Sequence, residues 1–278
     1  MIRIEGLVKS YGALKVLRGI ELEIPAGELF AYLGPNGAGK TTTIRILTGQ
    51  TRLDRGSATL NGFCIHREAL SAKRQVGYVP QLNNLDRELS VYENMWIHGR
   101  LYHMESRALK RRIPEMLEYV GMADQTAVLG KHLSGGFQRR LMIARALLHE
   151  PRILFMDEPT VGLDAGIRRR LWSLIKYIQE NGTTIFLTTH YIEEAEFLAQ
   201  RVAFLDGGRI VALDSPKNLM ARQGTWAIDR FSREHMETLY FNTRAAAESY
   251  NDHHDDRHTL RRVNLEDAFL ALTGKRVK

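Results

Sequence analysis

Apolar and polar positions divide the N-terminal part of the chain into short strands and one helix. Residues 1–12 and 17–28 carry apolar side chains in strand-like patterns bounded by turn residues, so they predict an antiparallel sheet. Residues 28–34 are a continuous apolar run of strand length. A glycine-rich turn follows, and residues 41–50 then place apolar side chains at helical spacing. We expect this helix to end near Gly49.

The middle of the chain changes to a helical pattern. Between about residues 82 and 132, apolar residues recur at three- and four-residue spacing, which predicts an inserted helical subdomain. Three later stretches, 152–156, 183–190 and 201–213, have the character of buried strands, and the helical stretch 165–182 separates the first two. Strands that alternate with helices favour a parallel sheet covered on both faces.

A change of character near Gly224 predicts a domain boundary between residues 1–223 and 224–278. The C-terminal part has weak strand and helix patterns. It closes with a predicted helix that Asn264 can cap and Gly274 can end.

Composition excludes some classes of protein. With 278 residues, 44% of them hydrophobic, the chain can bury a core and should be globular. No stretch approaches the ~20 apolar residues of a membrane-spanning helix. The N-terminus lacks a long apolar secretory region and the single Cys64 cannot form an internal disulfide, so we expect the cytosol. The net charge of +7 is scattered, which favours a solvated basic surface, and the HHDDRH stretch at 253–258 favours a solvated loop over a metal site.

Residues 34–41 match the phosphate-binding pattern G-x-x-x-x-G-K-[ST], after a predicted strand and at the start of a predicted helix. In such a loop, backbone N–H groups surround phosphate oxygens and the helix N-terminus adds partial positive charge. Lys40 should reach the β- and γ-phosphates, and Thr41 can ligate Mg²⁺. The predicted nucleotide-binding residues are Gly34, Pro35, Asn36, Gly37, Ala38, Gly39, Lys40, Thr41 and Thr42.

Polar side chains also end two of the predicted strands. Asp157 and Glu158 follow the strand at 152–156, and His190 ends the next one. Ligands of open α/β folds bind at the carboxyl ends of parallel strands. We expect the two carboxylates to point differently, so that one holds the metal through water and the other accepts a proton from the attacking water. The imidazole of His190 can hydrogen-bond a γ-phosphate at the same edge.

A second anion site is predicted at LSGGFQRR, residues 133–140. This stretch places Ser134, Gly135 and Gly136 at the start of a predicted helix, where the helix dipole favours negative charge. One nucleotide does not obviously need two such elements. The second element therefore raises the question of whose phosphate it binds.

Together these motifs resemble the nucleotide-binding subunit of ATP-binding cassette (ABC) transporters, over roughly residues 2–214. Gln81 in GYVPQ matches the Q-loop, Asp164 in GLD the D-loop, and LSGGFQ the signature. The resemblance implies an α/β fold, that of a P-loop NTPase with an ABC ATPase core. That core has a mixed or parallel sheet with flanking helices, an N-terminal antiparallel β subdomain and a helical subdomain at about 82–145. Residues 224–278 would be a small α+β C-terminal domain.

The resemblance also implies roles for individual residues, with ATP and Mg²⁺ as cofactors. Glu158 would be the general base, acting with His190 and Gln81. Asp157 and Gln81 would serve the Mg²⁺ shell with Thr41. Two further residues would touch the nucleotide site: Asp164, which communicates across the dimer, and Tyr11, which matches the adenine-stacking aromatic.

In this family two cassettes pack head to tail, so each ATP lies between the phosphate loop of one and the signature of the other. The implied partners are a second cassette, as a homodimer, and separate membrane permease subunits, with no nucleic acid. The implied location is the cytoplasmic face of the plasma membrane, as a peripheral protein, with part of the helical subdomain as the docking groove. One departure is Phe137 in the fifth position of the usual LSGGQ, which puts the fine positioning of the partner's nucleotide in doubt.

Residues 89–104 and 264–274 look like the drug-resistance branch of exporter ATPases, similar to the daunorubicin-resistance and nodulation-factor export type. An importer ATPase shares every catalytic motif and stays an alternative. A non-transport cassette acting on nucleic acid or the ribosome is a further alternative. Such proteins usually carry two cassettes or a long coiled coil, and the sequence has neither. The motifs do not specify the transported substrate, because the cargo pathway of this architecture lies mainly in the membrane subunits.

Overall fold

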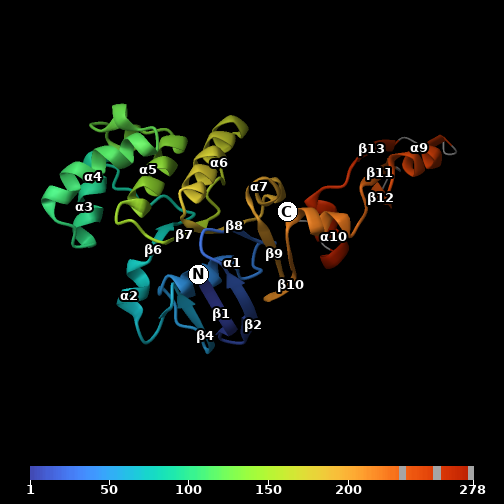
Figure 1. Ribbon diagram of the computed structural model, residues 1–278, viewed down its shortest axis with the longest axis horizontal. Helices are drawn as coiled ribbons and strands as arrows, with labels where there is room; N and C mark the ends of the chain where they lie inside the picture. Colours follow the sequence, from blue (N-terminus) through green and yellow to red (C-terminus); the bar gives the residue numbers. More distant parts are fainter. Residues whose placement is uncertain (232–235, 253–257, 275–278) are drawn as a thin grey trace.

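A four-stranded antiparallel sheet forms the N-terminal part of the computed structural model, which describes residues 1–231, 236–252 and 258–274 (Figure 1). The side chains of β1 alternate, with Ile2 and Ile4 buried and Arg3 and Glu5 exposed. This period of two follows from the pleat of the strand. The antiparallel pairing of β1 with β2 confirms the predicted antiparallel sheet. The strand order is β2-β1-β4-β5, formed by β1 (Ile2–Tyr11), β2 (Leu14–Ile24), β4 (Arg55–Leu60) and β5 (Phe63–Cys64).

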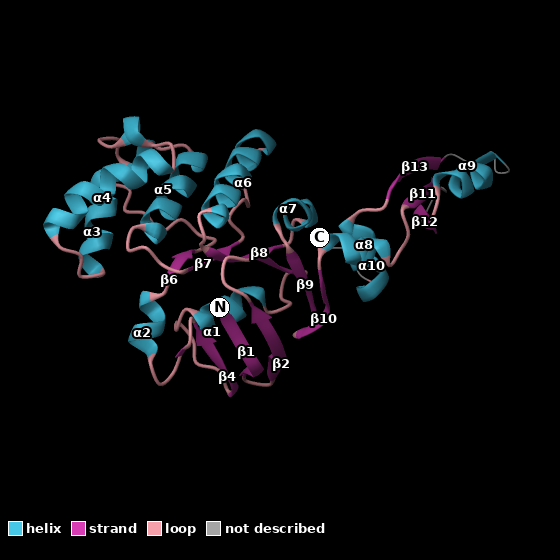
Figure 2. Ribbon diagram, viewed as in Figure 1, coloured by secondary structure: helices cyan, strands magenta, loops and turns pink. Residues whose placement is uncertain are grey.

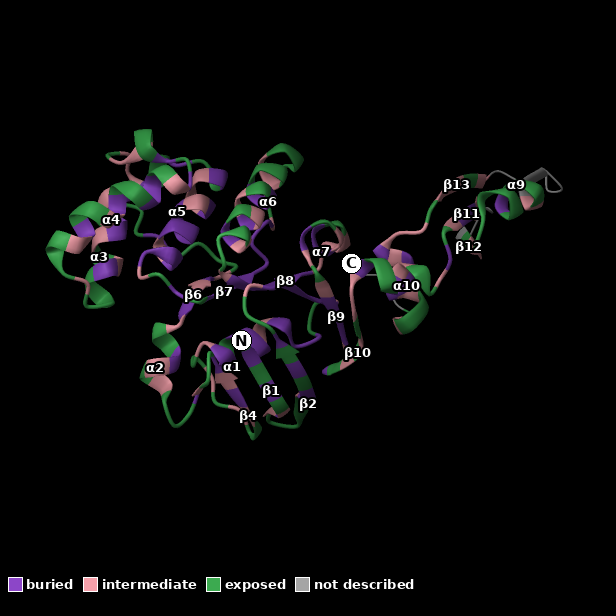
Figure 3. Ribbon diagram, in the orientation of Figure 1, coloured by how far each residue is buried: buried purple, intermediate pink, exposed green. Residues whose placement is uncertain are grey.

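A second sheet of six strands has the order β10-β9-β3-β8-β7-β6. Its strands are parallel except for β10, which runs antiparallel to β9. Strands β3, β7 and β8 are buried along their whole length, as expected for a sheet covered on both faces. Figure 3 shows this for β7 and β8. The six strands are β3 (Leu29–Leu33), β6 (Val76–Val79), β7 (Ile153–Asp157), β8 (Thr184–Thr189), β9 (Arg201–Asp206) and β10 (Arg209–Asp214).

The stretch 201–213, expected as one buried strand, is instead the hairpin of β9 and β10. Gly207 and Gly208 turn the chain with φ values of 54° and 77°, which glycine adopts readily. The carbonyl of Gly208 accepts a hydrogen bond from the backbone N–H of Arg18 at 2.9 Å. A Cβ atom at Gly208 would lie 2.3 Å from the carbonyl oxygen of Val16, so the hairpin sits directly against β2 of the N-terminal sheet.

Three helices and two 3₁₀ turns form a helical group at one end of Figure 1, and its apolar cluster continues into one face of the six-stranded sheet. Met95, Leu109, Ile113 and Leu141 come from the three helices and are buried in one apolar cluster. This group is the expected helical subdomain. It comprises α3 (Val91–Leu101), α4 (Ser106–Tyr119), the turns η1 (Ala123–Gln125) and η2 (Gly130–His132), and α5 (Gly135–Leu147). The other helices before residue 224 are α1 (Lys40–Leu47), α2 (Ala69–Arg74), α6 (Ala165–Glu180), α7 (Ile192–Leu198) and α8 (Pro216–Ala221).

A small antiparallel sheet of order β12-β11-β13 lies beyond residue 224, next to α9 (Figure 2). Arg261 joins this sheet to the last helix. Its guanidinium donates to both carboxylate oxygens of Asp229 and to both of Asp267, at 2.6–3.0 Å. The elements are β11 (Trp226–Phe231), β12 (Met236–Phe241), α9 (Arg244–Asp252), β13 (His258–Arg262) and α10 (Leu265–Thr273).

Helix α10 returns to the core of the preceding residues. Leu265 and Phe269 are fully buried in a cluster with Phe204 of β9 and Leu219 of α8. Its predicted ends are confirmed, because Asn264 accepts a hydrogen bond from the backbone of Asp267 and Gly274 takes a left-handed conformation. The domain boundary at residue 224 stays a prediction, and α10 contributes its apolar face to the larger part of the chain.

No helix within the described residues is long and apolar enough to cross a membrane. The same described ranges contain no cluster of three or more metal-ligating side chains. The HHDDRH stretch falls outside them except for His258, so its predicted solvated loop is not described.

Candidate active site

The phosphate loop connects β3 to α1, as the sequence predicts. Gly34 lies close to β9, the neighbour of β3 in the sheet. A Cβ atom at Gly34 would stand 2.4 Å from the carbonyl oxygen of Leu205 in β9. Gly39 has a φ of 114°, and a Cβ atom there would lie 2.6 Å from Leu17. Both positions therefore require glycine, for close approach and for backbone conformation. The loop delivers the N-terminus of α1 to the carboxyl edge of the six-stranded sheet.

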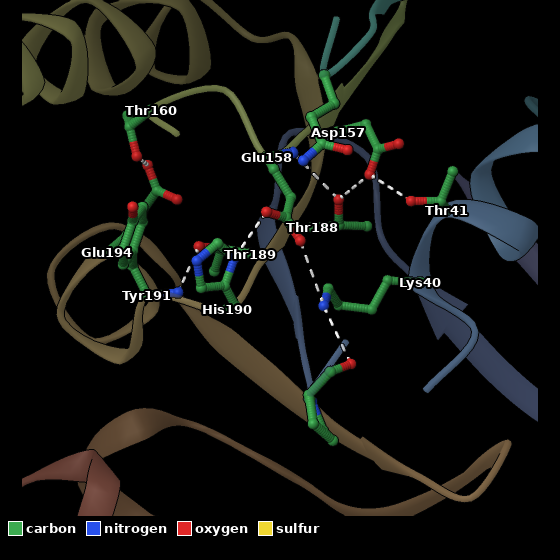
Figure 4. Close-up of polar contacts among 12 residues, drawn as sticks. Lys40, Thr41, Asp157, Glu158, Thr160, Thr188, Thr189, His190, Tyr191 and Glu194 are labelled. Atoms are coloured by element: carbon green, nitrogen blue, oxygen red, sulfur yellow. Dashed lines mark hydrogen bonds and ion pairs between the residues drawn. The ribbon is translucent and has the colours of Figure 1, made fainter. Parts of the chain in front are cut away.

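Lys40 is the first residue of α1, and only 4% of its surface is exposed. Its Nζ donates to the Gly34 carbonyl at 2.7 Å. The same nitrogen lies 3.3 Å from Oε1 of Glu158 (Figure 4). Burial lowers the pKa of Lys40, and the charges of Glu158 and Asp157 oppose that shift. The loop and Glu158, which follows β7, thus hold a cation where the phosphates of a bound nucleotide would lie.

Asp157 ends β7 and is almost fully buried. Its Oδ1 accepts hydrogen bonds from Thr188 at 2.5 Å and from Thr41 at 3.2 Å (Figure 4). Burial is the largest influence on Asp157 and raises its pKa, while the two threonine hydroxyls act in the opposite direction. Carboxylate and hydroxyl oxygens are the donors that Mg²⁺ prefers, so the Asp157 and Thr41 pair fits that ion.

Glu158 follows Asp157 but points elsewhere, as the sequence predicts. Its backbone has a φ of 49°, an unusual conformation for a residue other than glycine. The backbone N–H of Glu158 donates to the Thr188 carbonyl at 3.0 Å. Its side-chain Oε2 lies 2.6 Å from Nδ1 of His190 (Figure 4). Glu158 therefore faces Lys40 with one carboxylate oxygen and His190 with the other.

A buried glutamate on α7, the helix that follows His190, was not predicted. Glu194 of α7 is fully buried, and its Oε1 accepts hydrogen bonds from Thr160 at 2.8 Å and from Trp172 at 3.0 Å. These contacts join α7 to α6 and to the segment after Glu158. The helical spacing of Glu194 with the buried Ala195 and Leu198 is the signal that could have revealed it.

Burial raises the pKa of Glu194. The folded state therefore holds that proton more tightly than the unfolded state, and the ionised form costs stability as the pH rises through the folded-state pKa. Glu194→Gln keeps an acceptor for both donors, so we expect its stability relative to wild type to improve from acidic to neutral pH. Glu194→Ala should lower the free energy of unfolding by about 2–4 kcal/mol, because two buried donors lose their acceptor.

Urea unfolding of both variants at a series of pH values tests this expectation. Glu193→Gln is the matched control, because Glu193 is adjacent on α7 and exposed. A glutamine variant as unstable as the alanine variant would contradict it.

Other predicted site residues lie apart from this group. Gln81 has an exposed side chain, and its carbonyl accepts a hydrogen bond from Arg139. Tyr11 at the end of β1 is 47% exposed. Asp164 caps α6 through the backbone N–H of Ile167. Across the described ranges, no hydrogen bond joins these three side chains to the carboxylates of β7.

The signature begins α5, with Ser134 as its N-cap and no side-chain hydrogen bond to the helix. A Cβ atom at Gly136 would lie 2.8 Å from Ile167, so the signature packs against the start of α6 in its own chain. Phe137 packs against the helical subdomain core. Gln138 donates to the carbonyl of Leu133 and accepts from Asn83. Gln138, which stands one position later than the glutamine of the usual LSGGQ, therefore makes its hydrogen bonds within its own chain.

A phosphate loop, a buried lysine and an acidic pair at one sheet edge define a P-loop nucleotide-binding protein. The ABC transporter family profile matches residues 17–161, which include the phosphate loop, the signature and the acidic pair. The chain therefore belongs to the ABC transporter family, and it is an ATPase subunit of that family.

Similar proteins confirm the predicted branch. The chain is 39% identical to Nod factor export ATP-binding protein I of Cupriavidus pinatubonensis, over 97% of this chain and 90% of that protein. It is 36% identical to a daunorubicin resistance ATP-binding protein of Streptomyces coeruleorubidus, over 100% of this chain and 98% of that protein. A linearmycin resistance ATP-binding protein of Bacillus subtilis is 39% identical, over 81% of this chain and 72% of its own length.

Solved structures confirm the predicted fold class. Part of the ABC transporter complex cbiONQ, from Clostridium perfringens, has a TM-score of 0.74 at 27% identity, covering 79% of this chain and 90% of that chain. A dimeric ATP-binding cassette in a post-hydrolysis state bound to ADP and Pi has a TM-score of 0.70 at 27% identity. This match covers 77% of this chain and 98% of that chain.

Proposed function

We propose that this chain is the ATPase of an exporter, and that it hydrolyses Mg·ATP between the phosphate loop and the carboxyl ends of β7 and β8. One observation carries the assignment of the reacting residues. Lys40 and His190 converge on the two carboxylate oxygens of Glu158, at 3.3 and 2.6 Å, beside the phosphate loop. A cation, a base and an imidazole at one point are the groups that phosphoryl transfer to water needs.

Glu158 acts as the general base. It accepts a proton from water as the water oxygen bonds to the γ-phosphorus and the bond to the β–γ bridging oxygen breaks, giving ADP and phosphate. Lys40 neutralises charge on the β- and γ-phosphates, and the backbone N–H groups of residues 34–41 surround their oxygens. His190 holds Glu158 through Nδ1 and orients it toward the water.

Bound Mg²⁺ supplies neutralisation of the phosphate charge. Thr41 and Asp157 would hold that ion, and Gln81 would contribute to its shell from an exposed loop. Tyr11, also exposed, stacks on the adenine. The accessible positions of Gln81 and Tyr11 leave both side chains room to move.

The second phosphate-binding element serves a neighbouring copy of the chain. Ser134, Gly135 and Gly136 face the γ-phosphate held by the partner's Lys40, and Asp164 lies at the same interface. The side-chain hydroxyl of Ser134 makes no hydrogen bond to its own helix, which leaves it available for such a phosphate.

Mixing two inactive variants tests this arrangement. Lys40→Ala removes the phosphate-loop half of a site, and Ser134→Arg removes the signature half by bulk and charge. A mixed dimer combines the intact phosphate loop of one chain with the intact signature of the other. We therefore expect each variant alone to lack ATPase activity and the mixture to regain part of it.

A mixture as inactive as its components would exclude a site shared between two chains. Activity of Ser134→Arg alone would exclude its signature from the site. Mixing Lys40→Ala with Lys40→Ala,Ser134→Arg is the matched control, because no pairing of these chains restores a complete site.

Export and membrane attachment complete the proposal. Relatives that match nearly the whole chain are named as export and drug-resistance ATP-binding proteins. Separate permease subunits would dock on the helical subdomain, where Leu82, Ile97 and Leu101 are 80%, 47% and 72% exposed. The cassette then acts as a peripheral protein on the cytoplasmic face of the membrane, with no nucleic-acid partner.

A further inference from the structure

The ring of His190 belongs to a row of side-chain contacts that reaches α6, and it is tilted by 39° relative to the ring of Tyr191. Tyr191 lies beside it with the ring centroids 4.3 Å apart (Figure 4). The guanidinium of Arg168 covers the Tyr191 ring, with Cζ 4.5 Å from the ring centroid. The order in space is Arg168, Tyr191, His190 and Glu158, with the last two joined by their 2.6 Å contact. This row of contacts leads from α6 to the carboxylate of Glu158 beside the phosphate loop.

Arg168 is itself held by the D-loop. One of its terminal nitrogens donates to the Leu163 carbonyl at 3.4 Å, and the N-cap of its helix is Asp164. Its Nε is buried and makes no hydrogen bond to any described residue. The Tyr191 ring face and the D-loop carbonyl contact the guanidinium directly, and the buried carboxylate of Glu194 adds a charge interaction with Arg168.

Helix α7 fixes the backbone position of Tyr191. Tyr191 is the N-cap of α7, and its backbone N–H donates to the Thr189 hydroxyl at 2.9 Å. One turn further, Glu194 is tied to Thr160 and Trp172. The Tyr191 ring can therefore shift relative to its backbone only by side-chain rotation, and the Arg168 guanidinium opposes that rotation.

We propose that Arg168 and Tyr191 are positioning residues, which hold His190 against Glu158 and make that position depend on the D-loop. The proposal rests on the hydrolytic role proposed for Glu158 and His190. A cation over a ring is attracted by the ring's negative face, and a partly desolvated contact is worth about a factor of ten in an equilibrium. Loss of the contact should thus release His190 without removing any group that binds the nucleotide.

Steady-state ATPase kinetics of four variants test the proposal. Tyr191→Leu and Arg168→Met should each lower kcat about tenfold and leave KM for Mg·ATP within about twofold of wild type. Tyr191→Phe keeps the ring and should keep kcat. Arg169→Met is the matched control, because Arg169 is the next residue of α6 and is exposed; its kinetics should equal those of wild type.

The variant combining Tyr191→Leu with Arg168→Met gives a second readout. Because both side chains act through one contact, it should lose no more activity than the poorer single variant. If the fold-loss of kcat in the double variant equals the product of the losses in the two single variants, the two side chains act independently, and this result would overturn the proposal. An unchanged kcat in Tyr191→Leu, or an equal loss in Tyr191→Phe, would overturn it too. If Tyr191→Leu fails to fold in a thermal melt, Arg168→Met and Tyr191→Phe decide.

The same measurements separate this proposal from the one on which it rests. Wild-type protein without Mg·ATPase activity, or Glu158→Gln with normal activity, would refute the hydrolytic roles themselves. An active wild type and an inactive Glu158→Gln, with unaffected Arg168→Met, would refute only the positioning roles.

Discussion

Glu158→Gln should lower kcat for Mg·ATP hydrolysis by about 10²–10⁴-fold, because removal of a general base typically costs that factor. Glutamine is nearly the same size as glutamate and can accept a hydrogen bond from His190 in place of Oε2. It cannot take a proton from water at neutral pH. ATP binding should therefore persist, and the two cassettes should stay closed around nucleotide that they cannot hydrolyse.

Turnover assays and size-exclusion chromatography with light scattering, each with and without Mg·ATP, measure the two halves of this expectation. Glu193→Gln is the matched control, since it makes the same chemical change at an exposed site on α7. Normal turnover in Glu158→Gln would remove Glu158 from its role. A monomer that still binds ATP would mean that the membrane subunits are needed to hold the closed dimer.

Lys40→Ala should weaken the binding of Mg·ATP itself by about 10–100-fold, because a charge-assisted hydrogen bond is worth about 1.5–3 kcal/mol. The effect should fall on the ground state, since the proposed contact of Lys40 with the β- and γ-phosphates forms before any bond breaks. The substitution also leaves Oε1 of Glu158 without its cation at 3.3 Å. Catalysis should therefore be lost together with affinity.

Isothermal titration with Mg·ATP measures this loss. Lys217→Ala is the matched control, because Lys217 is exposed on α8. An affinity for ATP equal to that of wild type would contradict the phosphate contact of Lys40. Together, the two variants separate binding from hydrolysis: one should bind and not turn over, and the other should fail to bind.

Much of the site could be predicted because its signals are local in sequence. The phosphate loop needs glycine at particular backbone positions, and the structure shows why for Gly34 and Gly39. Asp157 and Glu158 could be placed at the sheet edge because residues at the carboxyl end of a buried parallel strand lie at that edge. Their divergence was expected as well, and it is seen in their different partners: Asp157 contacts Thr188 and Glu158 contacts His190.

Other features could not be predicted, because they arise between elements that are distant in sequence. Thr160 and Trp172 meet Glu194 only because α6 and α7 pack together. In the sequence, Arg168 is not distinguished from the two arginines that follow it. Only the fold places its guanidinium over the ring of Tyr191. The turn at Gly207 and Gly208, taken as part of one strand, is stabilised by contact with β2.

By itself the sequence determined the class of fold and the family, and it located the phosphate-loop and signature motifs, since each depends on periodicity or on residues close together in the chain. Only the tertiary structure decided how Glu158 is shared between Lys40 and His190, and that α10 completes the core beside Phe204. It also decided that the D-loop touches the histidine through Arg168 and Tyr191. Such contacts depend on the relative placement of helices and strands, which long-range packing sets and local patterns do not encode.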